Sequence, residues 1–215
     1  MNIGVHFGKR VTALITRMDE PLGRFVGNAL EVKECLDILE GKRWSGEGKG
    51  YDDTLALTLE LAAQMLVLGG KARSLEEGRT LASGTLQDGS ALKKFREVVS
   101  AQGGSLAEFK TGAAHCETVA AERDGFFTYT DIEKIGLACV HLDAGRAFQG
   151  DTLDFNAGIE VFCQQSTPVK KGQTLFRLHC SDLAKAQQAL PVLNASFVIQ
   201  NQPVARTPLI IKVLT

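Results

Sequence analysis

The sequence predicts a mixed fold, α/β in its first part and α+β in its second, and three observations support this. A β-branched run at residues 11–16 precedes a turn rich in proline and glycine and then the start of a helical pattern. Further helical patterns continue to residue 104. Beyond residue 118, short apolar runs typical of strands alternate with only two helical segments.

The first element is a strand at residues 11–16, and the helix after the turn begins at Asn28 and runs to about Glu40. Asn28 is expected to cap this helix, and Glu31 holds the capping-box position three residues later. Strand, turn and helix together indicate one βα unit of a parallel sheet, where ligands gather at the carboxyl ends of strands. The strand's neighbours in such a sheet would have to come from outside the residues that follow it.

Three more helices are expected before residue 104. Four glycines at residues 41–50 first predict a flexible surface loop. The apolar residues at 55–68 occupy nearly every face of the next helix, which predicts that it is buried. Ser74 and Glu77 form a capping box at the start of another helix, and residues 90–101 form a further amphipathic one.

The pattern changes near residues 105–118, where we place a linker between a first domain (1–104) and a strand-rich second domain (119–215). The segment 168–175 predicts a hairpin, because a turn glycine follows two lysines between two apolar runs. The second domain is also predicted to contain strands at 117–121, 125–130, 159–164, 174–179, 195–199 and 209–214 and helices at 131–142 and 181–190.

Composition excludes several function classes. The chain has 24 basic and 25 acidic residues, so nothing in its charge suggests a nucleic-acid or membrane partner. The N-terminus lacks the apolar core of a signal peptide, and the longest apolar run, at 61–68, is too short to span a bilayer. Five scattered cysteines without C-x-x-C spacing fit reduced thiols in a cytoplasmic protein.

The histidines and cysteines show no spacing typical of a metal or nucleophile site. His115-Cys116 and His179-Cys180 are adjacent pairs, and neighbours along a strand point to opposite faces. We interpret both pairs as ordinary core or surface residues. Residues 143–151 contain glycines but open no helix, so we expect a surface loop and not an anion site.

Five segments carry a family resemblance. P-L-G-x-x-x-G-N-A-L-E-V-x-E, at 21–34, resembles the signature segment of the thymidine and pyrimidine-nucleoside phosphorylases. The resemblance continues, in the same order, through L-x-L-E-L-A-A-Q-M-L-V-L-G-G (57–70), G-S-A-L-K-K-F-R-E-V-V-S-A-Q-G-G (89–104), I-G-L-A-C-V-H-L-D-A-G-R (135–146) and V-K-K-G-Q-T-L-F-R-L-H (169–179). It corresponds to the C-terminal half of the family. The implied fold is the end of the α/β catalytic domain followed by the strand-rich C-terminal domain.

The resemblance also implies a site for a K⁺-type cation, with no other cofactor required. Its ligands would include the backbone carbonyls of Leu22 and Phe25 and the carboxylate of Glu34. Several carbonyls and one carboxylate suit a weakly charged hard ion. The alternative is that Glu34 caps or pairs locally, for instance with Arg24, and that no ion binds.

The function implied by the resemblance is phosphorolysis, in which a pyrimidine nucleoside and phosphate give the free base and a pentose 1-phosphate. Family members are pentosyltransferases of pyrimidine salvage, cytoplasmic homodimers acting on thymidine or uridine. The family's phosphate loop (K-H-S-T-G-G-V-G-D) and base-binding segment (S-I-M-S-K-K) do not occur among the 215 residues. The nearest similar segment, at 90–94, lacks the second serine and comes after the P-L-G segment.

We therefore expect a truncated member of the family. Residues 1–9 match the end of a helix that begins upstream in the family. The chain is expected to carry no catalytic or substrate-binding residues and to be inactive alone. Two alternatives stay open. One is a non-catalytic scaffold or partner-binding short form. The other is a lipoyl-like carrier module, which only the segment 168–175 supports.

Overall fold

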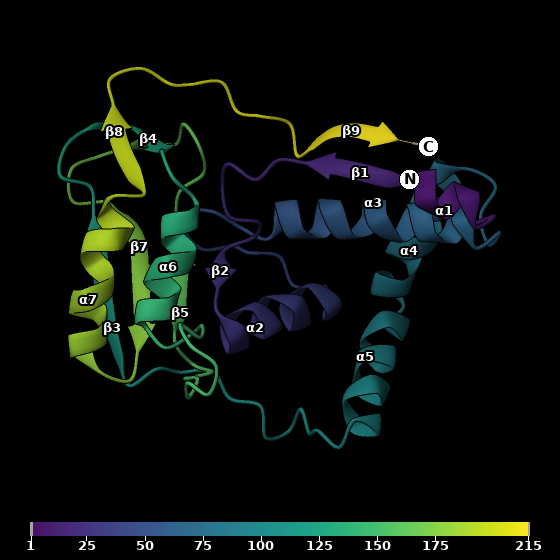
Figure 1. The fold of residues 1–215 in the computed structure, drawn as a ribbon, viewed down its shortest axis with the longest axis horizontal. Helices are drawn as coiled ribbons and strands as arrows, with labels where there is room; N and C mark the ends of the chain where they lie inside the picture. Colours follow the sequence, from purple (N-terminus) through teal and green to yellow (C-terminus); the bar gives the residue numbers. More distant parts are fainter. Residues whose placement is uncertain (1, 215) are drawn as a thin grey trace.

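The computed structural model describes residues 2–214, which combine helices with antiparallel sheets (Figure 1). The helices are α1 (Asn2–His6), α2 (Asn28–Leu39), α3 (Asp52–Leu68), α4 (Leu75–Gln87), α5 (Ser90–Ala101), α6 (Glu133–His141) and α7 (Leu183–Asn194). The strands are β1 (Ala13–Thr16), β2 (Phe25–Val26), β3 (His115–Ala120), β4 (Gly125–Tyr129), β5 (Gly158–Val161), β6 (Pro168–Val169), β7 (Thr174–Cys180), β8 (Phe197–Gln200) and β9 (Ile210–Leu214). The predicted mixture of α/β and α+β structure is confirmed.

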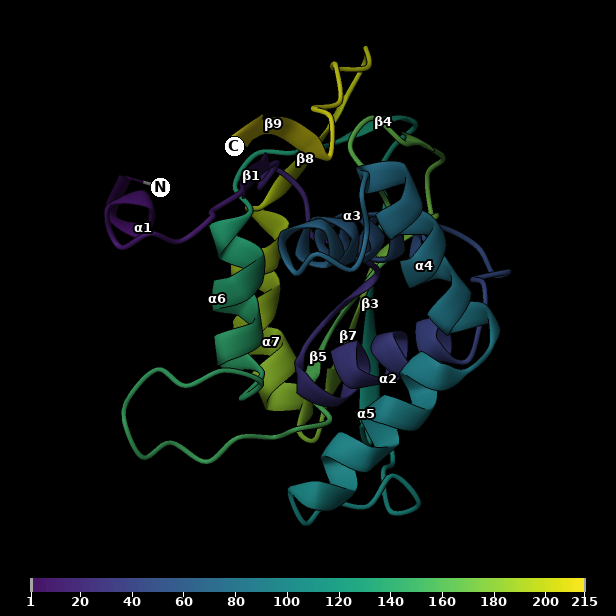
Figure 2. The same ribbon diagram turned by 90° about the vertical axis from the view of Figure 1, so that its right-hand side faces the viewer.

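The strands form three small sheets. β2, β5, β7 and β3 lie in that order in the largest, β6, β4 and β8 form the second, and β1 pairs with β9. Helices α6 and α7 lie together on one face of the largest sheet, as both views show (Figures 1 and 2). Helices α2 and α5 lie on the opposite side of the molecule from α6 and α7 in Figure 2.

The main hydrophobic core lies between the largest sheet and helices α6 and α7. Phe127, Phe176 and Leu178 are fully buried in it. The Phe127 ring stacks on Phe197 at 5.3 Å between ring centroids and meets Tyr129 edge-on. Because burial of each large apolar side chain contributes about 1.5–3 kcal/mol, this core supplies most of the driving force for the strand-rich part.

The expectation of parallel neighbours for the first strand is wrong. β1 pairs antiparallel with β9, with Ala13 opposite Leu214, and every strand pairing among residues 2–214 is antiparallel. The cause is the segment after β8, which runs back over the molecule toward α3 (Figure 1). β9, whose residues lie 194 to 201 positions after their partners in β1, thus supplies the partner that the local sequence does not.

The prediction that residues 55–68 form a buried helix is half right. The helix forms, as α3, but its buried residues are Glu60, Ala63 and Gln64. Leu61 and Met65 stay 42% and 71% exposed. Composition indicated the helix but not which face would be covered, because α4 packs against the side of α3 that carries Glu60 and Ala63.

The predicted hairpin at 168–175 is also wrong. Pro168 and Val169 pair with β4, whereas β7 belongs to the largest sheet. The turn between them instead connects two sheets, with Gly172 in the left-handed region at φ 84°. Strands also cross the predicted domain boundary, since β2 joins the sheet of β5 and β9 returns to β1. The division at residues 105–118 itself stays a prediction.

Candidate functional site

The turn after β1 is organised around the carboxylate of Glu34. One oxygen accepts the backbone N–H groups of Arg24 (2.8 Å) and Phe25 (3.2 Å), and the other accepts the hydroxyl of Thr54 (2.5 Å). Glu34 is buried on α2, so these bonds form away from water and fix the turn to two helices. Glu34 therefore has the local pairing role that the sequence offered as the alternative to ion binding. Its contact with Arg24 is made by the backbone amide of Arg24 and not by the guanidinium.

Gly23 allows this approach. Its φ of 69° lies in the left-handed region, and a Cβ atom built there would be 2.0 Å from the Glu34 carboxylate. Any side chain would therefore both strain the backbone and displace the carboxylate. The glycine of the P-L-G segment is thus explained by a close contact rather than by the turn alone.

Asn28 does not cap α2 as predicted. The capping position is Gly27, and the Asn28 amide donates instead to the carbonyl of Ala144 at 2.9 Å. Glu31 supplies only one half of the predicted capping box: its carboxylate accepts the N–H of Gly27, four residues earlier, at 3.0 Å, and glycine has no side chain to form the reciprocal bond. The asparagine is used to join α2 to the loop after α6, a tertiary contact that a local pattern cannot reveal.

The three residues predicted to hold a cation, Leu22, Phe25 and Glu34, line one cavity of about 380 Å3. Arg17 and Ile135 contribute to its other walls, from the end of β1 and from α6. The structure thus brings the predicted set together in a space that a small ion could occupy.

The Glu34 carboxylate keeps some capacity to contact a cation in this cavity. The Arg24 carbonyl accepts the N–H of Val161, so the alternation of an antiparallel pair turns the Phe25 carbonyl away from β5. A carboxylate offers about four lone pairs, and three are already used on Glu34. Glu34 therefore has capacity for one further contact, which suits an ion held mainly by carbonyls.

Lys49 was not anticipated in this site. The loop at 41–50 is largely exposed, as predicted. Lys49, near the end of this loop, is an exception, because only 3% of it is exposed. Its ammonium donates to the carbonyl of Pro21 beside the cavity. Burial lowers its pKa to about 8, against the opposing effect of the carboxylates of Glu20 and Asp53. A lysine within a glycine-rich loop carries no signal of burial, so sequence reasoning could not find it.

Arg24 connects this site to the largest sheet. Its Nε donates to Glu160 at 2.8 Å, and its guanidinium lies over the rings of Trp44 (3.8 Å) and Phe162 (4.2 Å). Burial lowers the pKa of Arg24, with the Glu160 contact opposing the shift. Burial also opposes ionisation of Glu160, but its contacts with His179 and with Arg24 outweigh this and lower its pKa to about 2.

A second ionic cluster joins the N-terminal half of the chain to the segment before β9. Arg206 pairs with Glu20 (2.6 Å) and with Asp53 (2.8 Å), and Arg17 pairs with the same two carboxylates at 2.9 and 2.5 Å. Arg17 also donates to the carbonyl of Thr207 at 3.0 Å. These contacts hold the segment before β9 beside the end of β1.

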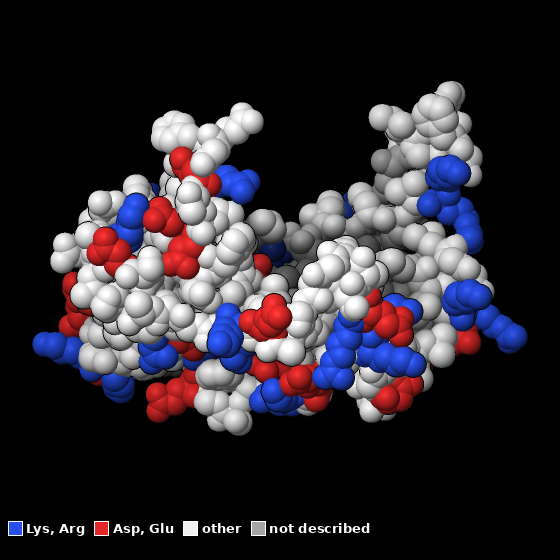
Figure 3. Space-filling view, turned by 90° about the horizontal axis from the view of Figure 1, so that it is seen from below, with Lys and Arg blue, Asp and Glu red and all other residues white. Residues whose placement is uncertain are grey.

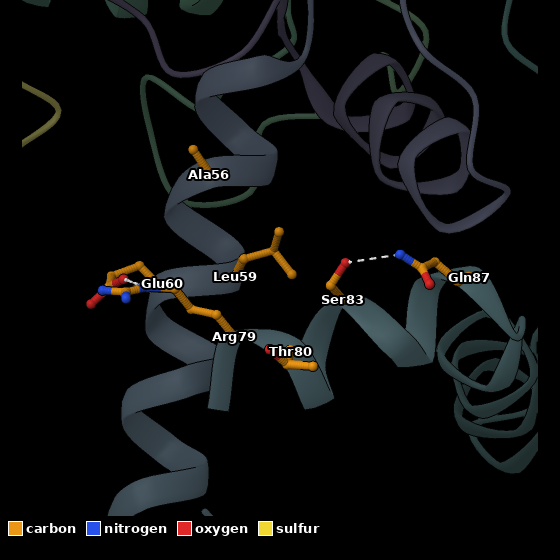
Figure 4. A pocket seen from close by; sticks show the side chains of 7 residues that line it. All are labelled: Ala56, Leu59, Glu60, Arg79, Thr80, Ser83 and Gln87. Carbon is orange, nitrogen blue, oxygen red and sulfur yellow. Dashed lines mark hydrogen bonds and ion pairs between the residues drawn. The ribbon is translucent and has the colours of Figure 1, made fainter. Parts of the chain in front are cut away.

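Another cavity, of about 520 Å3, lies between α3 and α4 (Figure 4). Glu60 and Arg79 pair across it at 2.7 Å, and that contact, with burial opposing it, lowers the pKa of Glu60. Ser83 and Gln87 on α4 contact each other at 3.4 Å. Its two ionisable groups, Glu60 and Arg79, are paired with each other, so it is a weaker candidate than the cavity beside Glu34.

The face of the molecule shown in Figure 3 offers no further candidate site. On the face shown in Figure 3, basic and acidic side chains are interspersed, and neither sign gathers into a patch. None of the helices in the described part of the chain is both long and apolar enough to cross a membrane.

The loop at 143–151 binds its own amides. Asp151 accepts the N–H groups of Ala147 (3.0 Å) and Phe148 (2.8 Å), so these donors are already used, as expected for a surface loop.

The two adjacent His-Cys pairs lie on strands, where neighbouring side chains alternate between the two faces of the sheet. These pairs are His115-Cys116 on β3 and His179-Cys180 on β7. Sequence reasoning missed that Cys116 lies opposite His179 across the β3–β7 pair.

Two family profiles match the chain. Residues 2–92 match the glycosyl transferase family, a/b domain, and residues 126–200 match the pyrimidine nucleoside phosphorylase C-terminal domain. The pyrimidine-nucleoside phosphorylase of Staphylococcus haemolyticus is 35% identical over 221 residues, covering 100% of this chain and 49% of that protein. The pyrimidine-nucleoside phosphorylase of Staphylococcus aureus is 33% identical, with the same coverage of each chain.

A thymidine phosphorylase of Mycobacterium tuberculosis is 37% identical over 98% of this chain and 46% of its own length. The chain thus spans about half the length of the curated relatives it matches. The matches extend over both the helical and the strand-rich parts, in the order that the quoted motifs predict. The chain therefore belongs to the family of the thymidine and pyrimidine-nucleoside phosphorylases.

Proposed function

We propose that this chain supplies the scaffold half of a pyrimidine-nucleoside phosphorylase. Its activity would be the transfer of a pentosyl group from a pyrimidine nucleoside to phosphate in cytoplasmic pyrimidine salvage. The similarity to pyrimidine-nucleoside and thymidine phosphorylases over 98–100% of the chain is the observation that carries this proposal. The family segments that grip phosphate and base are not among its 215 residues, so the chain alone is proposed to be inactive.

A chimera tests this proposal. The chain would replace the matching 49% of the Staphylococcus haemolyticus protein. We expect the chimera to release thymine or uracil from its nucleoside in a phosphate-dependent reaction, because the scaffold is complementary to the other half. A folded, dimeric chimera without phosphorolysis would contradict the proposal.

We further propose that the Leu22 and Phe25 carbonyls and the Glu34 carboxylate hold a K⁺-type cation. Their common cavity and the remaining acceptor capacity of Glu34 support this. In the chimera, activity should rise with K⁺, and Glu34→Gln should raise the K⁺ concentration needed by about tenfold or more, since a neutral amide attracts a cation less. Glu40→Gln, which removes an exposed charge directly after the same helix and away from the cavity, is the control. Equal K⁺ dependence in all three proteins would exclude the site.

A second candidate function is that of a partner-binding short form, and exposed apolar side chains favour it. Ile3 and Val5 on α1 and Phe7 directly after it are 77%, 62% and 73% exposed, and Met65 on α3 is 71% exposed. Surfaces of this kind are typical of protein contacts. The proposed partner is a full-length subunit of the same family, and a homodimer is the corresponding state of the complete protein.

Sedimentation of the chain with the intact Staphylococcus haemolyticus protein distinguishes the two functions. A short form should give a mixed complex that Met65→Lys weakens. A chain that sediments separately, as a monomer or as aggregates of its own, would exclude the partner-binding function while leaving the chimera experiment unaffected.

A further inference from the structure

Three chemistry-bearing side chains from three strands meet on the outer face of the largest sheet. Cys116 on β3 lies directly opposite His179 on β7, and Glu160 on β5 lies opposite Arg177, two residues before His179. Because residues two apart on a strand share a face, the thiol, the imidazole and the carboxylate project on the same side. The neighbours at alternate positions, such as Leu178, are buried in the core on the other side.

The three groups form a continuous row. The Cys116 Sγ lies 3.5 Å from His179 Nδ1, within the range of a sulfur hydrogen bond. His179 Nε2 lies 3.6 Å from a Glu160 oxygen, which is an electrostatic contact rather than a hydrogen bond, and the buried Nε2 has no other polar partner in the described part of the chain. A carboxylate at this position places the ring proton on Nε2. Nδ1 is then left as an acceptor that faces the thiol.

The carboxylate in this row is rigidly held. Arg24 donates to one of its oxygens at 2.8 Å and Arg177 to the other at 2.9 Å. Glu160 is 5% exposed, whereas Cys116 is exposed on β3, the last strand in the sheet order. The row therefore runs from a fixed, buried anion to a thiol that molecules in solution can reach.

The other four thiols are poorly suited to react. Burial raises the pKa of Cys139 and of Cys163 to about 12, and it also raises that of Cys180. Partial desolvation, together with the carboxylates of Glu34 and Glu31, raises the pKa of Cys35. Since the thiolate is the nucleophile, a raised pKa makes these four cysteines slow to react near neutral pH.

We propose that Cys116 is a nucleophilic thiol that forms a mixed disulfide with low-molecular-weight disulfides, with His179 as its general base. The Sγ proton moves to His179 Nδ1, and the thiolate attacks one sulfur of the incoming disulfide. A bond forms between Sγ and that sulfur as the original S–S bond breaks. The departing thiolate takes the proton from His179. One thiol and one disulfide are consumed and one of each is formed, so the incoming disulfide is the oxidant and no further one is required.

The experiment uses the 215-residue chain and an aromatic disulfide that releases a coloured thiolate. Peptide mass analysis at a series of reaction times gives the rate at each cysteine. At pH 7 we expect Cys116 to react about tenfold or more faster than Cys35, the other exposed thiol. His179→Gln should slow Cys116 by about tenfold or more, because the base is lost.

His115→Gln is the matched control. His115 precedes Cys116 on the same strand but projects to the other face, so its loss should change the rate by less than about twofold. Added imidazole should restore part of the rate in His179→Gly, which a purely structural role of the histidine would not predict. The proposal is overturned if Cys35 reacts first, or if folded His179→Gln reacts at the wild-type rate.

Discussion

At the residue scale, stability depends on charged side chains that have left the solvent. Arg24, 1% exposed, is the most buried of them, and its partner Glu160 is almost as well covered. Breaking a buried pair leaves an uncompensated charge, so Arg24→Met should lower the free energy of unfolding by about 3–5 kcal/mol. Lys94→Met, which breaks the exposed pair with Glu97, should cost less than about 1 kcal/mol. Urea unfolding measures both, and equal losses would contradict the importance of burial.

The same pair predicts a dependence on acid. The pKa of Glu160 is lowered from 4.5 to about 2, so its ionised form stabilises the fold above pH 4.5, and this contribution is lost as the pH falls toward 2. The difference in unfolding free energy between the wild-type protein and Glu160→Gln should therefore shrink over this range. A difference that stays constant between pH 5 and pH 2 would show that the carboxylate is not held by its cationic neighbours.

Lys49 adds a second dependence of stability on pH, at the other end of the pH scale. Its pKa is lowered from 10.5 to about 8, so between these values the unfolded chain binds more protons than the folded one. The contribution of Lys49 to stability thus increases as the pH rises from 8 to 10.5, by about 3 kcal/mol at most. Lys49→Met should remove this increase. If the unfolding free energies of the wild-type protein and Lys49→Met change in parallel between pH 8 and pH 10.5, the lowered pKa of Lys49 is contradicted.

At the element scale, helix α4 contains a matched pair of glycines. A Cβ atom at Gly78 would lie 2.9 Å from the Ala63 carbonyl of α3, whereas one at Gly84 would meet nothing within 4 Å. Gly84→Ala should raise the unfolding free energy by up to about 1 kcal/mol, the difference in helix propensity. Gly78→Ala should lower it, because α3 and α4 must separate. Thermal unfolding of the two variants checks this, and stabilisation by both would show that the helices are not in close contact.

The helices and strands were predictable because their signals are local. The helix at 90–101 was predicted with its observed bounds, and the strand-rich pattern after residue 118 was correct. The wrong predictions concern contacts between residues that are far apart in the sequence. The partner of β1 comes from β9, Asn28 bonds to Ala144 instead of capping, and β6 pairs with β4. In the site, the motif indicated the set around Glu34, but the burial of Lys49 follows from packing that no local pattern records.

At the scale of the whole molecule, an ionic cluster joins the N-terminal half of the chain to the segment before β9. The cluster consists of Arg17, Glu20, Asp53 and Arg206. Arg206→Ala removes the contacts with Glu20 and Asp53 that hold the segment before β9. Hydrogen exchange of the β1 and β9 amides should become faster, by about tenfold for each 1.4 kcal/mol lost, while β5 and β7 keep their protection. Lys212→Ala, at an exposed position on β9, should leave exchange unchanged. Equal exchange rates in both variants would show that the strands pair without help from the ionic contacts of Arg206.

The central claim is that this chain is one half of a phosphorolytic site and not a complete one. Thymine release from thymidine and phosphate tests it most directly, measured for the chain alone and after mixing with the separately expressed other half of the Staphylococcus haemolyticus protein. We predict no release above the buffer rate by the chain alone and phosphate-dependent release by the mixture. Phosphate-dependent thymine release by the chain alone would contradict the account.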